Sequence, residues 1–231
     1  MCGRYVSTAT PEQLVAEYHV EQVCLDAPLP PRWNVAPTQP VYVVATEREP
    51  EPRRQLGTMR WGLVPSWEKR ATPGAGLINA RAETVATRPA FRSALRRRRC
   101  VVPADSFWEW RAGPGGSRQP FAIARRGGAT LAFAGLWEPW RDPASPERVL
   151  RSVAIITTAA NRRLAEVHER MPVVLDAPAL DRWLDPGTLD PGLLLPLLLP
   201  APEDGWEVWP VGARVNSVAN DGPDLLEPAA G

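Results

Sequence analysis

Short apolar runs rich in β-branched and aromatic residues recur along the chain, separated by turns rich in glycine and proline. Two of these turns, at 113–116 and 126–128, have the composition of tight connections between neighbouring strands. Short runs of such residues bounded by turn signals are typical of β-strands. The pattern predicts strands at residues 41–44, 59–64, 100–102, 107–110, 121–124, 131–137 and 153–157.

Four segments have a helical pattern instead. The first has a clear start signal: Thr10 is a typical N-cap residue, Pro11 suits the first helical position and Gln13 completes a capping box, so we expect a helix ending near Tyr18. The other three are expected at 89–97, 161–168 and 177–184. Because strands do not alternate regularly with long helices, a parallel βαβ sheet is not expected. The sequence predicts an α+β fold with a mainly antiparallel, barrel-like β core and peripheral short helices.

Length and composition limit the classes of protein. The 231 residues suffice for one well-buried core, and no linker divides them, so we expect a single domain, with 185–207 as a late surface excursion. Three widely spaced cysteines predict no disulfide framework, and two histidines leave no zinc-ligand cluster. There is no signal-peptide pattern, and the apolar run at 193–199 is broken by Pro196 and too short for a bilayer span of about 20 residues. We expect a cytoplasmic monomer with no metal, cofactor or membrane partner.

The basic residues are unevenly distributed, although the net charge is only +1. Arg92 and residues 96–99 form a dense arginine run, which most often means a solvated face. Lys69 is the only lysine. An imine with an aldehyde can therefore form only at Lys69 or at the N-terminus, and the other cations are guanidinium groups suited to phosphate.

Cys2 is the strongest chemical signal. Removal of Met1, as is usual before a small residue, would leave a thiol and a free α-amine on one residue, both with nucleophilic fractions near neutral pH. Such a 1,2-aminothiol can close a five-membered thiazolidine ring on an aldehyde. It can also attack an amide carbonyl, with the amine as its own base. From the first residues alone, a cysteine without function at position 2 is about as probable as a functional one.

Three further segments combine polar side chains with stiff surroundings. Asn79 and Arg81 alternate with apolar residues, and Glu109 stands between Trp108 and Trp110, where desolvation would raise the pKa of its carboxyl unless a cation opposed it. His168 follows a helical pattern that a proline ends. Each of these also has an ordinary structural reading, as turn chemistry, as a partner of a buried arginine or as a helix cap.

Seven segments taken in order resemble the SOS response-associated peptidase family, the abasic-site-processing proteins that crosslink to DNA. The resemblance covers residues 2 to about 228 and defines the expected domain. Two departures are Ser106, where glycine is usual, and Glu169, where aspartate is common. The segments are MCGRY, WNVAPTQP, MRWGLVPSW, LINARAET, RRCVVPADSFWEW, TTAANRRLAEVHERMPVVL and VNSVANDGPDLLEP.

This resemblance implies a function in the DNA damage response. Family members capture the ring-opened aldehyde of an abasic site in single-stranded DNA as a thiazolidine crosslink, which protects the strand from cleavage; reversal and a weak lyase side reaction are also expected. By the same match Cys2 is the nucleophile, Asn79 orients the reacting centre, Glu109 engages the α-amine and His168 shuttles protons. The implied DNA contacts are phosphate contacts at Arg4, Arg81 and Arg170, stacking at Trp67, and a pocket wall at Asn34 and Pro37. The expected partner is abasic single-stranded DNA, with nucleoid association when bound, whereas a replication partner cannot be derived.

Three alternatives remain open at this stage. The chain could be a glutamine amidotransferase of the N-terminal-nucleophile type, whose cysteine releases ammonia from an amide. It could be a peptidase that cleaves a leader before Cys2, although only Met1 precedes that residue. It could also be a non-catalytic reader of modified bases, with a pocket built by Asn34, Trp67 and Asn79.

Overall fold

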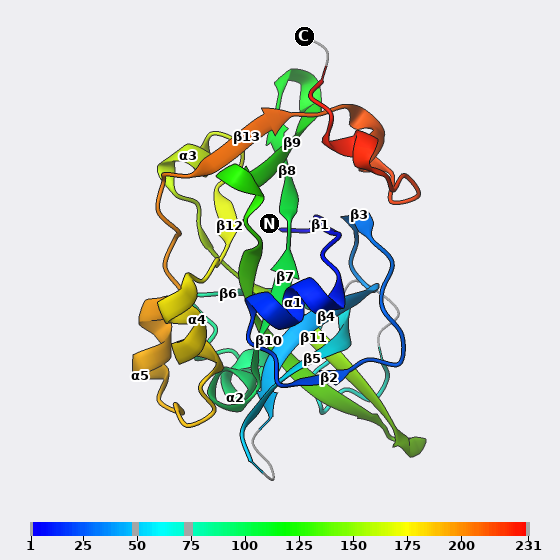
Figure 1. The fold of residues 1–231 in the computed structure, drawn as a ribbon, viewed down its shortest axis with the longest axis vertical. Coiled ribbons are helices and arrows are strands. Elements are labelled where there is room, and N and C mark those ends of the chain that lie inside the picture. Colours follow the sequence, from blue (N-terminus) through cyan, green and yellow to red (C-terminus); the bar gives the residue numbers. More distant parts are fainter. Residues whose placement is uncertain (1, 48–50, 72–75, 230–231) are drawn as a thin grey trace.

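Two β-sheets form the protein and lie one above the other along its long axis (Figure 1). The computed structural model describes residues 2–47, 51–71 and 76–229. Met1, whose removal the sequence predicts, lies outside these residues.

The first sheet closes into a five-stranded barrel. Its strands pair in the order β11-β10-β7-β4-β5, and a parallel pairing of Arg60 and Trp61 with Ser152 and Val153 joins β5 back to β11. Three short strands extend the barrel: β6 and β12 pair with β11, and β2 pairs with β5. The bounds are β2 (Gln22–Cys24), β4 (Pro40–Glu47), β5 (Arg53–Trp61), β6 (Asn79–Arg81), β7 (Arg99–Ala104), β10 (Leu131–Asp142), β11 (Ser145–Ala159) and β12 (Arg170–Pro172).

The second sheet is antiparallel throughout. Its order is β13-β9-β8-β1-β3, so the first strand of the chain lies between β8 and β3. One residue, Asp105, separates β7 from β8, so the chain passes almost directly from the barrel into this sheet. The bounds are β1 (Tyr5–Ser7), β3 (Arg32–Val35), β8 (Ser106–Ala112), β9 (Arg118–Arg125) and β13 (Trp206–Pro210).

Five short α-helices lie at the periphery: α1 (Pro11–Glu17), α2 (Pro89–Arg97), α3 (Arg162–Ala165), α4 (Ala177–Leu184) and α5 (Pro191–Leu194). The capping box of Thr10 and Gln13 forms as expected, with both reciprocal hydrogen bonds present. Every one of these helices is too short or too polar to cross a membrane.

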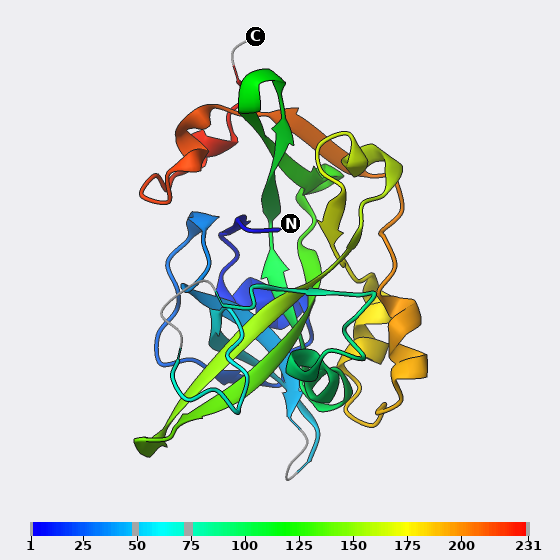
Figure 2. The same cartoon turned by 180° about the vertical axis from the view of Figure 1, so that it is seen from behind.

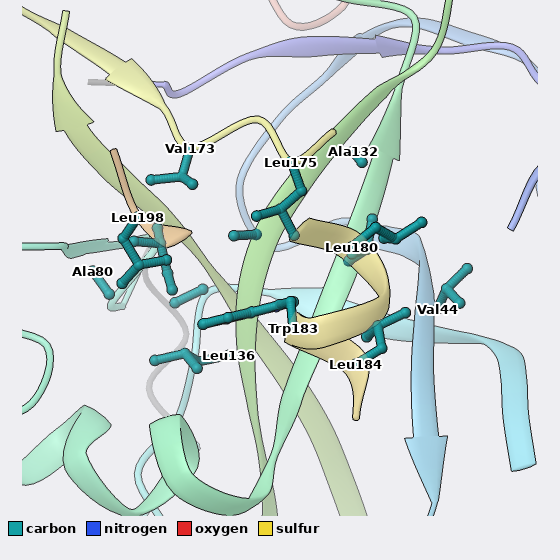
Figure 3. Packing of buried hydrophobic residues seen from close by; sticks show 14 of the residues in the cluster. Val44, Ala80, Ala132, Leu136, Val173, Leu175, Leu180, Trp183, Leu184 and Leu198 are labelled. Atoms are coloured by element: carbon teal, nitrogen blue, oxygen red, sulfur yellow. The ribbon is translucent and has the colours of Figure 1, made fainter. Parts of the chain in front are cut away.

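Strand residues of the barrel alternate between two apolar clusters, as the period of a strand requires. Val44 and Val101 belong to the outer cluster, which includes residues of α1, α2, α4 and α5. Figure 3 shows this layer, with Trp183 and Leu180 of α4 among residues of the barrel strands. Val43 and Val102 belong to the barrel-interior cluster, which also contains Cys2. The candidate nucleophile is thus packed in a cluster that extends from the barrel strands to residues of the second sheet, such as Phe107 and Trp206.

The predicted fold class is confirmed, and two local predictions are wrong. The helix expected at 161–168 is only the four-residue α3, because the Asn161 side chain caps it and the chain turns toward β12 before His168. The segment 185–207 is more ordered than a loop: it contains α5 and a 3-10 helix at Leu195–Leu197, and its end enters β13. Leu194 and Leu198 are buried against the outer cluster, which explains why this segment is fixed.

Candidate functional site

Cys2 lies just before β1 and is fully buried. Burial raises the pKa of its thiol well above the ordinary value, and the negative charge of Glu109 raises it further. A hydrogen bond involving the backbone of Arg4 opposes this effect. The thiol is therefore held in its protonated form near neutral pH.

Glu109 lies on β8 and is only 2% exposed. Burial raises the pKa of its carboxyl, and the charge of His168 is among the influences that lower it. The direction and its cause, desolvation by burial, match the sequence-based expectation, but the two flanking tryptophans do not supply that burial. Side chains alternate along a strand, so Trp108 and Trp110 point to the opposite sheet face and pack in a third apolar cluster, beneath the 3-10 helices of the C-terminal region. The apolar surroundings of Glu109 come from the barrel-interior cluster around Phe107.

Asn79 is brought to the site by β6, a three-residue strand that pairs in parallel with β11, where Asn79 lies opposite Ile155. Its Nδ2 donates a 2.9 Å hydrogen bond to the carbonyl oxygen of Cys2. Its Oδ1 is buried and accepts no hydrogen bond among the described residues. Asn79 thus fixes the backbone of Cys2 and keeps one acceptor available beside it.

His168 is oriented by Arg170, the first residue of β12. The Arg170 backbone holds the imidazole through Nδ1, which lies 3.0 Å from Arg170 N and 3.3 Å from Arg170 O. The Arg170 guanidinium binds both carboxylate oxygens of Glu83 and donates to the carbonyl oxygen of Thr157. This ion pair lowers the pKa of Glu83. Arg170 therefore positions His168, and the Arg170 side chain is 14% exposed.

The four expected catalytic residues converge on one place. Asn79 bonds to Cys2, the charge of Glu109 acts on the Cys2 thiol, and the charge of His168 acts on Glu109. They come from β6, the residues just before β1, β8 and the turn before β12. These segments are far apart in sequence, and Figure 1 places β6, β8 and β12 around the start of the chain.

Arg4 and Asn34 have an unexpected arrangement, because both hold the segment 213–221, which we call the C-terminal strap. Arg4 Nη1 donates to Asn34 Oδ1 at 2.8 Å and to Val215 O at 3.0 Å, and Nη2 donates to Asn216 O at 3.2 Å. The fully buried Asn34 amide donates to the carbonyl oxygens of Val215, Ser217 and Asn220 at 2.9–3.2 Å. Their contact with DNA stays a prediction.

The opposite end of the strap is fixed by Asp221. Its carboxylate accepts hydrogen bonds from the backbone N–H groups of Trp33 and Asn34 and pairs with Arg32. Nothing in the local sequence pattern indicated this contact, since the partners are more than 180 residues apart.

The remaining expected DNA contacts are accessible. Trp67 is 58% exposed, Arg81 is exposed on β6 and Pro37 is half-buried in the turn after β3. Two residues that the sequence did not single out hold the turn that carries Trp67. Trp140 Nε1 donates to Glu68 O at 2.8 Å, and Ser152 Oγ accepts from Val64 N at 2.8 Å.

Comparisons with known proteins agree on one family. The family model described as SOS response associated peptidase (SRAP) matches residues 1–218. The chain is 36% identical over 227 residues to abasic site processing protein YoqW of Bacillus subtilis (strain 168), covering 98% of this chain and 99% of that protein. It is 31% identical over 236 residues to abasic site processing protein YedK of Escherichia coli (strain K12), covering 99% and 100%. A crystal structure of a protein from Bacteroides thetaiotaomicron has the same fold, with a TM-score of 0.85, 22% identity and coverage of 99% and 100%.

Proposed function

Because this chain belongs to the SOS response-associated peptidase family, we propose that it processes abasic sites in single-stranded DNA by covalent capture at Cys2. Capture requires that everything before Cys2 is removed, which frees the α-amine. The amine attacks the aldehyde carbon of the ring-opened sugar, and loss of water gives an imine. The thiol sulfur then adds to the same carbon while the imine nitrogen takes a proton, which closes a thiazolidine ring.

The observation that carries this proposal is the convergence of Asn79 and Glu109 on Cys2. The bond from Asn79 to the Cys2 carbonyl fixes the residue whose amine must attack. Its unpartnered Oδ1 is an acceptor suited to an amine or ammonium N–H. Glu109 is a buried acid whose charge an α-ammonium would stabilise, and it can take a proton from either nucleophile.

The state of the thiol favours this order of events. The thiolate is the reactive form of a cysteine, and burial and Glu109 raise the pKa of Cys2, so its sulfur is a weak nucleophile at the start. This suits a mechanism in which nitrogen reacts first and sulfur adds to the more electrophilic imine. His168, held through Nδ1 by the Arg170 backbone, is the proposed proton donor to the sugar oxygen during ring opening.

The imine is also the point at which the DNA strand is at risk. An imine acidifies the neighbouring sugar carbon and promotes strand cleavage by β-elimination. Ring closure by sulfur removes this electron sink, so the proposed product protects the strand.

The test is a gel-shift count of crosslinks to abasic single-stranded DNA, with mass spectrometry of the N-terminal peptide. Wild type should give a stable adduct on Cys2 that has lost one water. Cys2→Ser keeps the amine without the thiol, so it should give only an imine that borohydride traps, with more strand cleavage. Cys24→Ala, which removes an exposed cysteine, is the matched control and should crosslink like wild type. Equal stable adduct from Cys2→Ala, or an adduct mapped to Lys69, would refute the proposal.

A further inference from the structure

The segment from β6 to the end of α2 carries an excess of positive charge that its neighbours do not balance. Residues 79–100 contain seven arginines and one acidic residue, Glu83. That glutamate is already bound by Arg170. Five arginines of the segment are exposed, and we call them the basic track: Arg81, Arg88, Arg92, Arg96 and Arg97.

The other two arginines serve the fold. Arg98 pairs with Glu138, whose side chain is 5% exposed. Arg99 is buried, and its guanidinium donates to backbone carbonyl oxygens of Leu95, Arg96, Trp183 and Asp185. The run of four arginines after Leu95 thus divides into two residues that hold α2 and α4 on the barrel and two that face solvent.

The basic track does not help α2 to form. Arg88 is the N-cap residue, makes no side-chain capping bond and places a cation at the positive end of the helix dipole. Arg88, Arg92 and Arg96 follow at intervals of four residues, and like charges at this spacing disfavour a helix. Arg96 and Arg97, in the last turn, are favoured by the dipole. Solvation alone gives no reason for an arginine at the N-cap. A bound polyanion would neutralise the repulsion among these arginines and the unfavourable charge at the start of the helix.

The basic track continues directly from the candidate site. Arg81 lies opposite Thr157, whose carbonyl oxygen binds Arg170 beside His168. Backbone hydrogen bonds from Thr84 N to Arg81 O and from Arg88 N to Thr84 O fold the connection to α2 into compact turns. Figures 1 and 2 both place α2 beneath β6, on the side away from the second sheet.

Arg88, Arg92 and Arg96 recur every four residues, so they lie about 6 Å apart along the axis of α2 and form one row of cations. Guanidinium groups also bind phosphate in a bidentate way.

We propose that the basic track is a second contact surface, which binds the phosphates of the DNA on one flank of the lesion. The identification of the ligand as DNA rests on the proposed function. The turn that carries Trp67 is held by Trp140 on the β10–β11 hairpin, and in Figure 2 this hairpin runs to the lower left while α2 lies to its right. The track and the Trp67 turn therefore serve opposite flanks.

The test compares Arg92→Gln/Arg96→Gln/Arg97→Gln with Arg53→Gln/Arg118→Gln/Arg148→Gln. The second triple removes the same charge from exposed positions elsewhere and is the matched control. Binding is measured on single strands with a tetrahydrofuran abasic analogue, which has no aldehyde, and with a long flank on the 5′ side, the 3′ side or both. Thermal melting checks that both triples are folded.

Loss of three contacts to single-stranded DNA should make the slope of log affinity against log salt shallower by about 2. Between 50 and 200 mM salt, wild type should then lose about 20-fold more affinity than the α2 triple, and only on strands with one of the two long flanks. The control triple should behave like wild type. Equal slopes for wild type and the α2 triple, or an equal change in the control triple, would overturn the inference. Failure of wild type to crosslink aldehyde-bearing DNA would refute the proposed function and leave this result interpretable, because the analogue reports binding alone.

Discussion

Replacing Asn34 by alanine is expected to lower the free energy of unfolding by about 3.5–5 kcal/mol. The asparagine amide has two N–H donors, which the carbonyl oxygens of Val215, Ser217 and Asn220 share, and its Oδ1 accepts from Arg4. Two neutral hydrogen bonds are worth about 1 kcal/mol each, and one to a charged group about 1.5–3 kcal/mol. For a chain of this length the melting temperature should fall by about 10 °C.

The assay is urea unfolding followed by tryptophan fluorescence, with limited proteolysis to detect release of the C-terminal strap. Asn216→Ala is the matched control: this asparagine also lies in the strap, but it is exposed and its side chain accepts one bond, from Trp110 Nε1. It should change stability by no more than about 1 kcal/mol. In Asn34→Ala the strap should become the first site of cleavage, because it loses its buried attachment.

The two interpretations of Asn34 give opposite outcomes. If Asn34 only lined a DNA pocket, as the sequence suggested, alanine would weaken DNA binding and leave unfolding within about 0.5 kcal/mol of wild type. That result would refute the argument that the strap is held through Asn34.

Two further predictions concern the site and its surroundings. Glu109→Gln should slow crosslinking yet raise stability, because burial raises the pKa of Glu109 in the folded state. The gain in stability should be absent well below the ordinary pKa of a glutamate and grow as pH rises, by about 1.4 kcal/mol for each unit of the shift. Urea unfolding from pH 4 to 7 measures this gain, and a gain independent of pH would contradict the burial argument. Trp140→Phe should loosen the turn that carries Trp67 and weaken binding to single-stranded DNA, for which base stacking is worth about 1–3 kcal/mol. Adding Trp140→Phe to Trp67→Ala should cost no further affinity, and an additive loss would show that Trp140 acts elsewhere.

Features encoded within a few neighbouring residues could be predicted from the sequence. The bounds of α2 and α4 were predicted to the residue, because proline near each start and the apolar face in each are local signals. The raised pKa of Glu109 was predicted in direction for a similar reason, since a carboxylate in an apolar run is expected to be buried.

Features that depend on distant partners could not be predicted. Strands β1 and β6 have three residues each, and only their pairing with β8, β3 and β11 makes them strands. The strap contacts of Arg4 join residues more than 200 positions apart, so its guanidinium looked like a free cation available for phosphate. The face to which Trp108 points depends on register, which local composition does not fix.

The burial of Cys2 constrains when the protein can mature. Trimming enzymes need the chain around the bond they cut to be unfolded, whereas β1 is paired with a neighbour on each side and Cys2 has no solvent-accessible surface. Under the proposed function, we therefore expect removal of what precedes Cys2 to occur on the nascent chain, before β1 is enclosed by its neighbouring strands. Protein that folds before this step should keep a blocked amine, so the fraction of molecules able to crosslink should depend on events during synthesis.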